Sequence, residues 1–368
     1  MGSPPVQVCT LGAQSVNHLS RTDGSAGLEP STPARSLSSA QQAFEVTVLA
    51  TIALGLIQTI QLAIPNSSQQ LALHCIEPAR PARAGVLFIH GATFATKLAS
   101  GYEFSANDSW LAFVAASGYL ACGFDFVGFG ASSRPAAMLE AADRAAPVLR
   151  TPEAAEQSAL AVDYLRSKRG LSAVHVVAHS WGTLPAAAFA AAHSAEIRSL
   201  TLFGPVVPVP GAPTQTAKRG AWYAMKAEDR LERLHFKGAL PPGKSLLDPQ
   251  VGQRWAREYA ASGPLVAGDA PGLLRIPEGP NADVDAATAG LLPYAPADVR
   301  VPVFVVYGNY DLIVDDAGAS AFLERFTASP LKWRMRIDDG THVMHLDRTR
   351  RSLYESVAAF MRTVEAQR

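Results

Sequence analysis

Short apolar runs recur along the chain and alternate with longer helix-like stretches, and this alternation restricts the fold more than any other feature. Each run has the length of a strand, and continuous apolar runs of this kind are typical of a sheet that is buried on both faces. Alternating strand and helix favours a mostly parallel sheet with helices on both faces. The runs are AGVLFIHG (84–91), GYLACGFDF (118–126), AVHVVAHS (173–180), IRSLTLFGP (197–205) and VPVFVVYGN (301–309).

A helix-like stretch, TPEAAEQSALAVDYLRSK, separates the second and third runs. Thr151 is predicted to be its N-cap, with Pro152 in the first turn. Before the first run, TIQLAIP and LALHCIEP read as two further strands, joined by the turn-forming residues NSSQQ.

The beginning of the chain differs in composition from the rest. Residues 1–43 are rich in Ser, Pro, Gly, Ala and Gln, which predicts a flexible leader. Residues 44–57 are an apolar segment of uncertain role, part of a longer apolar stretch that reaches residue 64. We consider a strand or helix packed on the domain, an export or anchoring segment, and a misplaced start site. The expected location is cytoplasmic, with export or membrane anchoring through 44–64 as the alternative.

About ninety-five residues lie between the fourth and fifth runs, far more than the spacing elsewhere. Residues 205–300 contain the helical patches AMKAEDRLERLHF and DPQVGQRWAREYAAS, with many Pro and Gly residues. We interpret 205–300 as a cap inserted over the sheet's C-terminal edge, and 58–204 with 301–368 as the core.

Charge and cysteine content exclude several functions. Only 17% of residues are charged, and Lys+Arg and Asp+Glu both number 32, with the basic residues scattered. This pattern argues against nucleic-acid binding. Cys9, Cys75 and Cys122 match no metal-binding or paired spacing, so we expect no disulfide and interpret Cys75 and Cys122 as packed thiols. The histidines form no metal-binding pattern, and we expect no metal and no cofactor.

The third run ends at a corner with the pattern small-x-Ser-x-Gly, Ala178 to Gly182. Such a corner places its serine on a sharp turn between strand and helix, and the small residues on either side prevent clashes. Ser180 would then stand at the C-terminal edge of the sheet, where open α/β sheets bind ligands. The corner therefore favours a nucleophilic serine.

With this corner the chain resembles the α/β-hydrolase family over about residues 58–366, although Ala178 replaces the family's usual first glycine. The resemblance implies a mostly parallel eight-stranded sheet flanked by helices, with a helical cap. It implies that HGATF, after the first run, supplies an oxyanion-hole donor at the Ala92 N–H, with Trp181 N–H as the other. His90 is expected to support this loop.

The resemblance also assigns an acid and a base. Asp311 follows Gly308 by three residues at the end of the fifth run, where the family commonly has its acid. His342 follows a glycine-containing turn after the last strand, LKWRMRI, and is the implied base, with His345 as the alternative. The order Ser180, Asp311, His342 is that of the family.

These residues predict a serine hydrolase of the carboxylesterase kind, which cleaves an ester of a small apolar substrate through an acyl-enzyme. An amidase, a lactonase, a carbon–carbon bond hydrolase and a catalytically silent binding protein remain alternatives. The sequence leaves the oligomeric state open, and membrane association is expected only through 44–64. Candidate substrate-binding residues in the cap are Trp222, Tyr223 and Met225.

Overall fold

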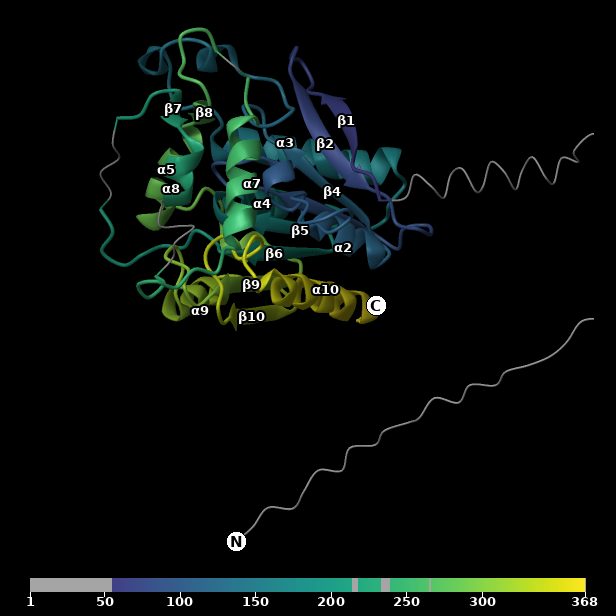
Figure 1. Ribbon diagram of the computed structural model, residues 1–368. Helices are drawn as coiled ribbons and strands as arrows, with labels where there is room; N and C mark the ends of the chain where they lie inside the picture. The colour runs from purple at the N-terminus through teal and green to yellow at the C-terminus, as the bar shows by residue number, and fades with distance from the viewer. Residues whose placement is uncertain (1–54, 214–217, 233–238, 265, 368) are drawn as a thin grey trace, which may run out of the picture. The chain divides into compact units, whose positions relative to one another are not determined.

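The computed structural model describes residues 55–213, 218–232, 239–264 and 266–367. Its main feature is an eight-stranded sheet of order β1-β2-β4-β3-β5-β6-β9-β10 (Figure 1). The pairs β1/β2 and β2/β4 are antiparallel and all the others are parallel. The strands are β1 (Gln58–Ala63), β2 (Gln70–Ile76), β3 (Gly85–Ile89), β4 (Leu120–Asp125), β5 (Val174–His179), β6 (Ser199–Phe203), β9 (Val303–Gly308) and β10 (Lys332–Ile337). The mostly parallel eight-stranded sheet is confirmed.

The central strands are apolar throughout because both of their faces are covered. In β5, Val176 and Ala178 belong to one hydrophobic cluster, whereas Val177 between them belongs to another. Side chains along a strand point alternately to opposite faces, so each cluster is the core of one face.

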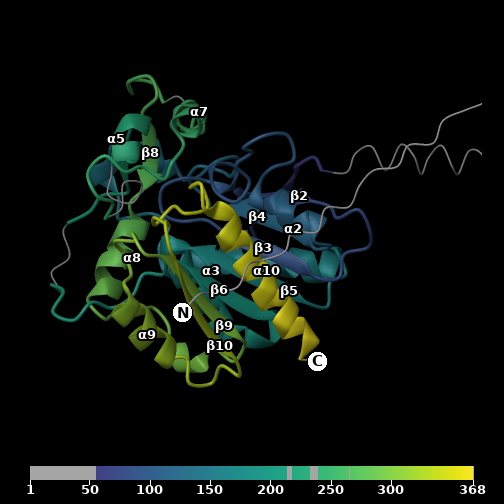
Figure 2. The ribbon, with the colours of Figure 1, turned by 60° about the horizontal axis from the view of Figure 1, so that its bottom comes forward.

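Helices cover both faces of the sheet. Figure 2 shows α10 lying across the face that also carries α2, and these two helices share one hydrophobic cluster. Helices α3, α4 and α9 contribute to the cluster of the other face. Their bounds are α2 (Trp110–Ala116), α3 (Thr151–Asp163), α4 (Thr183–Ala192), α9 (Asp316–Glu324) and α10 (Arg350–Ala366).

The segment between β6 and β9 forms further elements, which Figures 1 and 2 both place together at one side of the sheet. The predicted helical patches contain α5 and α7, but the antiparallel pair β7/β8 is not foreseen by the sequence analysis. The bounds of the proposed cap, 205–300, stay a prediction. The elements are β7 (Trp222–Met225), α5 (Ala227–Glu232), α7 (Pro249–Ala260), β8 (Leu274–Pro277) and α8 (Gly279–Thr288).

The N-terminal predictions fall largely outside the described residues. The leader 1–43 and the apolar residues 44–54 are among the residues that are not described. Residues 58–63, near the end of the apolar stretch, form β1 at the sheet edge. Within the described parts of the chain, no helix is long and apolar enough to cross a membrane.

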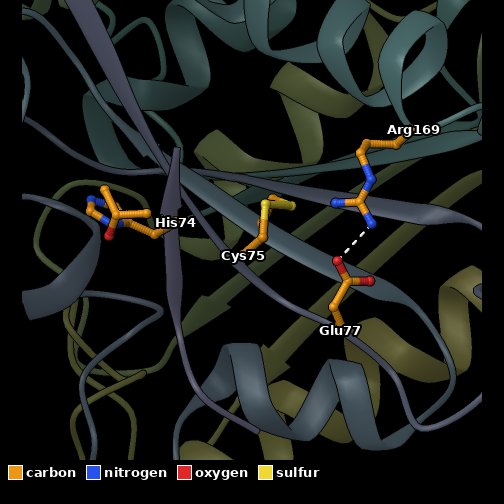
Figure 3. The surroundings of a disulfide bond; sticks show 6 residues. His74, Cys75, Glu77 and Arg169 are labelled. Carbon is orange, nitrogen blue, oxygen red and sulfur yellow. Dashed lines mark hydrogen bonds and ion pairs between the residues drawn. A yellow bond between two sulfur atoms is a disulfide. The ribbon is translucent and has the colours of Figure 1, made fainter. Parts of the chain in front are cut away.

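The interpretation of Cys75 and Cys122 as separate thiols is wrong, because they form a disulfide (Figure 3). They lie directly opposite each other in the antiparallel pairing of β2 with β4, with their Cα atoms 4.1 Å apart. A count of cysteines and their spacing could not reveal this, because the contact depends on strand register. Nearby, Glu77 and Arg169 form an ion pair of 2.6 Å.

The predicted N-cap of α3 also needs correction. Thr151 is the first residue of the helix, and its main-chain N–H and side-chain hydroxyl both donate to the carboxylate of Asp283, at 2.7 and 2.8 Å. Asp283 lies on α8 and takes the place of a local cap, which no short-range sequence signal indicates.

Candidate active site

Ser180 stands at the corner between β5 and α4, as the sequence predicts. Its φ is +56°, in the left-handed region that a non-glycine residue rarely adopts. The corner fits because Gly182 has no side chain: a Cβ atom there would lie 2.3 Å from the carbonyl oxygen of His90. Because strained backbone at a non-glycine residue is common at functional sites, this turn supports a functional role for Ser180.

The structure brings the three predicted catalytic residues together. Nδ1 of His342 lies 2.9 and 3.0 Å from the two carboxylate oxygens of Asp311, and its Nε2 lies 2.8 Å from Oγ of Ser180. With the proton on Nδ1 donated to Asp311, Nε2 is free to accept the hydroxyl proton of Ser180. The side chains of His342 and Asp311 are almost fully buried, so the hydrogen bonds between these two residues are shielded from water.

Each partner is held by its own turn. Asp311 follows β9, and the main-chain N–H of Ile313 donates to its Oδ1 at 2.8 Å. His342 follows β10, and Thr341 before it donates twice to the carboxylate of Asp347. Gly204, after β6, leaves room for both, since a Cβ atom there would lie 3.0 Å from Asp311 Oδ2 and from His342 Nδ1.

The loop after β3 passes directly beside Ser180. A Cβ atom on Gly91 would lie 3.0 Å from the Cβ atom of Ser180, and Ala92 lines the same cavity as the serine. Trp181 follows the serine in the first turn after β5. Ala92 and Trp181 thus belong to the two segments that meet at Ser180, and the role of their N–H groups as oxyanion-hole donors stays a prediction.

His90 has the supporting position that the sequence analysis expects. Its Nδ1 lies 2.7 Å from the carbonyl oxygen of Gly91, and its Nε2 accepts the main-chain N–H of Phe126 at 3.1 Å. Burial lowers the pKa of this ring, which stays neutral.

Two further histidines pack beside the site. His179 Nε2 donates to the carbonyl oxygen of His342 at 2.8 Å, which links the serine turn to the base. His345 is buried against His179 and Phe203, and neither of its ring nitrogens takes part in the hydrogen bonds of Ser180 and Asp311. The structure therefore brings His342, and not His345, to Ser180.

A cavity opens at Ser180 and His342. Of the three predicted substrate-binding residues, Tyr223 lines it. Trp222 donates instead to the carbonyl oxygen of Glu140, and Met225 is buried in the core. Sequence reasoning missed the other lining residues that come from 205–300, which are Val206, Arg230, Asn281 and Val284.

Among the described residues, no group of three His, Cys, Asp or Glu side chains is placed to hold a metal ion. The chemistry that the contacts of Ser180, His342 and Asp311 offer is that of an activated serine.

A sequence profile of the alpha/beta hydrolase fold matches residues 86–349. The chain belongs to the α/β-hydrolase family. A comparison with curated proteins gave no match.

Solved structures share the fold at low identity. A thermostable carboxyl esterase from Bacillus coagulans is 15% identical, with a TM-score of 0.56, over 84% of this chain and 98% of that one. A mutant of epoxide hydrolase from Solanum tuberosum is 16% identical, with a TM-score of 0.55, over 84% and 100%. Naproxen esterase from Bacillus subtilis is 15% identical, with a TM-score of 0.50, over 89% and 100%. At such identities the likeness concerns the fold alone.

Proposed function

We propose that this α/β-hydrolase is a serine esterase that cleaves a small ester substrate through an acyl-enzyme intermediate. The observation that carries the proposal is the continuous hydrogen-bonded chain from Asp311 through His342 to Ser180, which ends in a cavity. The neighbouring esterases support the reaction class only by their shared fold.

In the first step, Ser180 Oγ attacks the ester carbonyl carbon while its proton passes to Nε2 of His342. The negative charge of Asp311 stabilises the imidazolium that forms and holds the ring in the reactive tautomer. The N–H groups of Ala92 and Trp181 donate to the carbonyl oxygen as it becomes an oxyanion. Each such donor lowers the barrier by on the order of 3 kcal/mol.

In the following steps, the proton on His342 goes to the leaving alcohol, and the carbon–oxygen bond of the ester breaks. Water then enters, His342 takes one of its protons, and the hydroxide attacks the acyl-enzyme. Collapse of this second intermediate releases the acid and returns the proton to Ser180.

The substrate is proposed to be a small molecule with an apolar part, because the cavity lining includes Val206, Val284 and Ile313. The cytoplasmic location stays a prediction, with export as the alternative. The Cys75–Cys122 disulfide supports export, because disulfides persist mainly in oxidising compartments.

Labelling with a fluorophosphonate probe, followed by peptide mapping, tests the proposal. The probe phosphonylates a serine that a base has activated, so it should label Ser180 in the wild type and no residue in Ser180→Ala. His342→Ala should lose the label. His345→Leu is the matched control, since it removes the neighbouring histidine and should keep the label.

The same four proteins are then assayed on 4-nitrophenyl esters. We expect turnover to fall on the order of 10⁴-fold or more in Ser180→Ala and His342→Ala. A folded wild type that takes up no label and hydrolyses no ester would contradict the proposal and favour a ligand-binding role.

A further inference from the structure

A buried cation lies in the wall of the candidate active-site cavity. Arg230 belongs to α5, is 4% exposed and lines the same cavity as Ser180 and His342. None of the described residues that line this cavity is Asp or Glu. The mostly apolar wall of the cavity therefore includes a cationic side chain.

Contacts with the loop after β3 hold the Arg230 side chain in place. Its Nε donates to the hydroxyl of Thr93 at 2.7 Å, and its guanidinium carbon lies 5.5 Å from the ring centre of Phe94. Thr93 and Phe94 directly follow Ala92, the proposed oxyanion donor. The guanidinium is thus fixed to the loop that would contact the reacting carbonyl group.

The positive charge of Arg230 affects the pKa of histidines next to the candidate active site. It contributes to the lowered pKa of His345 and of His179, after burial and the neighbouring histidines. The guanidinium group of an arginine stays protonated at neutral pH. Its planar set of N–H donors can bind both oxygens of a carboxylate at once, so it fits a carboxylate better than a neutral group. Such a charge-assisted pairing with two parallel hydrogen bonds is both strong and selective.

We propose that Arg230 binds a carboxylate group of the substrate, so that the enzyme prefers esters that carry a second, ionised carboxyl group. This inference rests on the proposed esterase function of Ser180. It changes the expectation of a wholly apolar substrate, because Arg230, which the sequence analysis did not single out, lines the cavity.

Two matched pairs of esters test the inference. The first is 4-nitrophenyl hemiglutarate against its neutral methyl ester, with the carboxylate on the acyl side. The second is 4-carboxyphenyl acetate against 4-(methoxycarbonyl)phenyl acetate, with the carboxylate on the alcohol side. We expect the wild type to favour the ionised member at least tenfold in kcat/KM in one of the pairs.

Arg230→Gln should reduce that preference at least tenfold, mainly through a higher KM for the ionised ester. Lys226→Gln is the matched control, since Lys226 precedes Arg230 by one helical turn, is exposed and carries the same charge. The preference in this variant should stay within twofold of the wild type. Arg230→Lys should give an intermediate value, because it keeps the charge and loses the fork.

A wild type that hydrolyses both members of each pair equally would overturn the inference while leaving the esterase proposal intact. So would an Arg230→Gln variant that loses the same factor on ionised and neutral esters, because Arg230 would then act on the oxyanion or on the fold. If that variant does not fold, the wild-type preference decides. Failure of the esterase proposal looks different: no ester is cleaved and Ser180 takes up no probe.

Discussion

The ring of His345 is buried beside the base His342 and lacks a hydrogen-bond partner at either nitrogen among the described residues. Burial, with the nearby His342 and the charge of Arg230, lowers its pKa to about 3. His345 is therefore neutral at neutral pH in the folded protein, whereas in the unfolded chain it titrates near pH 6.5.

This difference predicts how stability depends on pH. Because the folded pKa is depressed, the contribution of His345 is fully present above pH 6.5 and is lost as the pH falls and the unfolded chain binds the proton. Between pH 7 and 4.5 the loss is on the order of 2–3 kcal/mol. Urea unfolding at both pH values should show that His345→Leu loses less stability than the wild type by this amount. Equal losses would mean that His345 titrates normally when folded.

Single residues were predictable where a local turn marks them. Ser180, Asp311 and His342 each follow a strand, and their turns have recognisable sequences. The position of Arg230 in the cavity wall was not predictable, because its side chain is held there by Thr93, which is 137 residues away in the chain. The resemblance to the family favoured His342 over His345, and in the structure the two equally buried rings differ in that only His342 contacts Asp311 and Ser180.

Among the helices, α8 contacts the corner that carries Ser180 through one carboxylate. Asp283 accepts from the first residue of α3, Thr151, pairs with Arg150 at 2.5 Å and lies 3.3 Å from the indole nitrogen of Trp181. Trp181 directly follows Ser180, so Asp283 connects α8, α3 and the serine turn.

Removal of this carboxylate should loosen all three elements. Asp283→Ala should lower the free energy of unfolding by on the order of 2–3 kcal/mol, since it removes a helix cap and charge-assisted hydrogen bonds. Asp283→Asn keeps one hydrogen-bond acceptor, so its free energy of unfolding should fall by less than that of Asp283→Ala. Urea unfolding of both variants measures the effect. A loss below about 0.5 kcal/mol in Asp283→Ala, the usual range of a surface substitution, would show that Asp283 is dispensable for these links.

The elements themselves were predictable to different degrees. The central strands have continuous apolar sequences, which identify them without knowledge of their neighbours. The strands β7 and β8 have four residues each, and they pair across about fifty residues of chain. These segments are too short to show a sequence pattern, and they form strands only because they pair with each other.

On the scale of the whole molecule, the parallel strands explain why distant residues meet. Ser180 follows β5, Asp311 follows β9 and His342 follows β10, and the carboxyl ends of parallel strands lie at one edge of the sheet. The antiparallel edge formed by β1 and β2 lies outside this arrangement, and β2 is joined to β4 by the Cys75–Cys122 disulfide.

Loss of the Cys75–Cys122 disulfide should lower the free energy of unfolding of the domain. The bond joins residues separated by 47 positions, and closing a loop of this length stabilises the folded state by about 4 kcal/mol through the unfolded chain. Unfolding and refolding in urea with a reductant should reveal this loss, and Cys75→Ala combined with Cys122→Ala should show at least as much. Alkylation of the denatured protein without reductant should leave Cys75 and Cys122 unmodified, and modification of both would show that the bond does not form in solution.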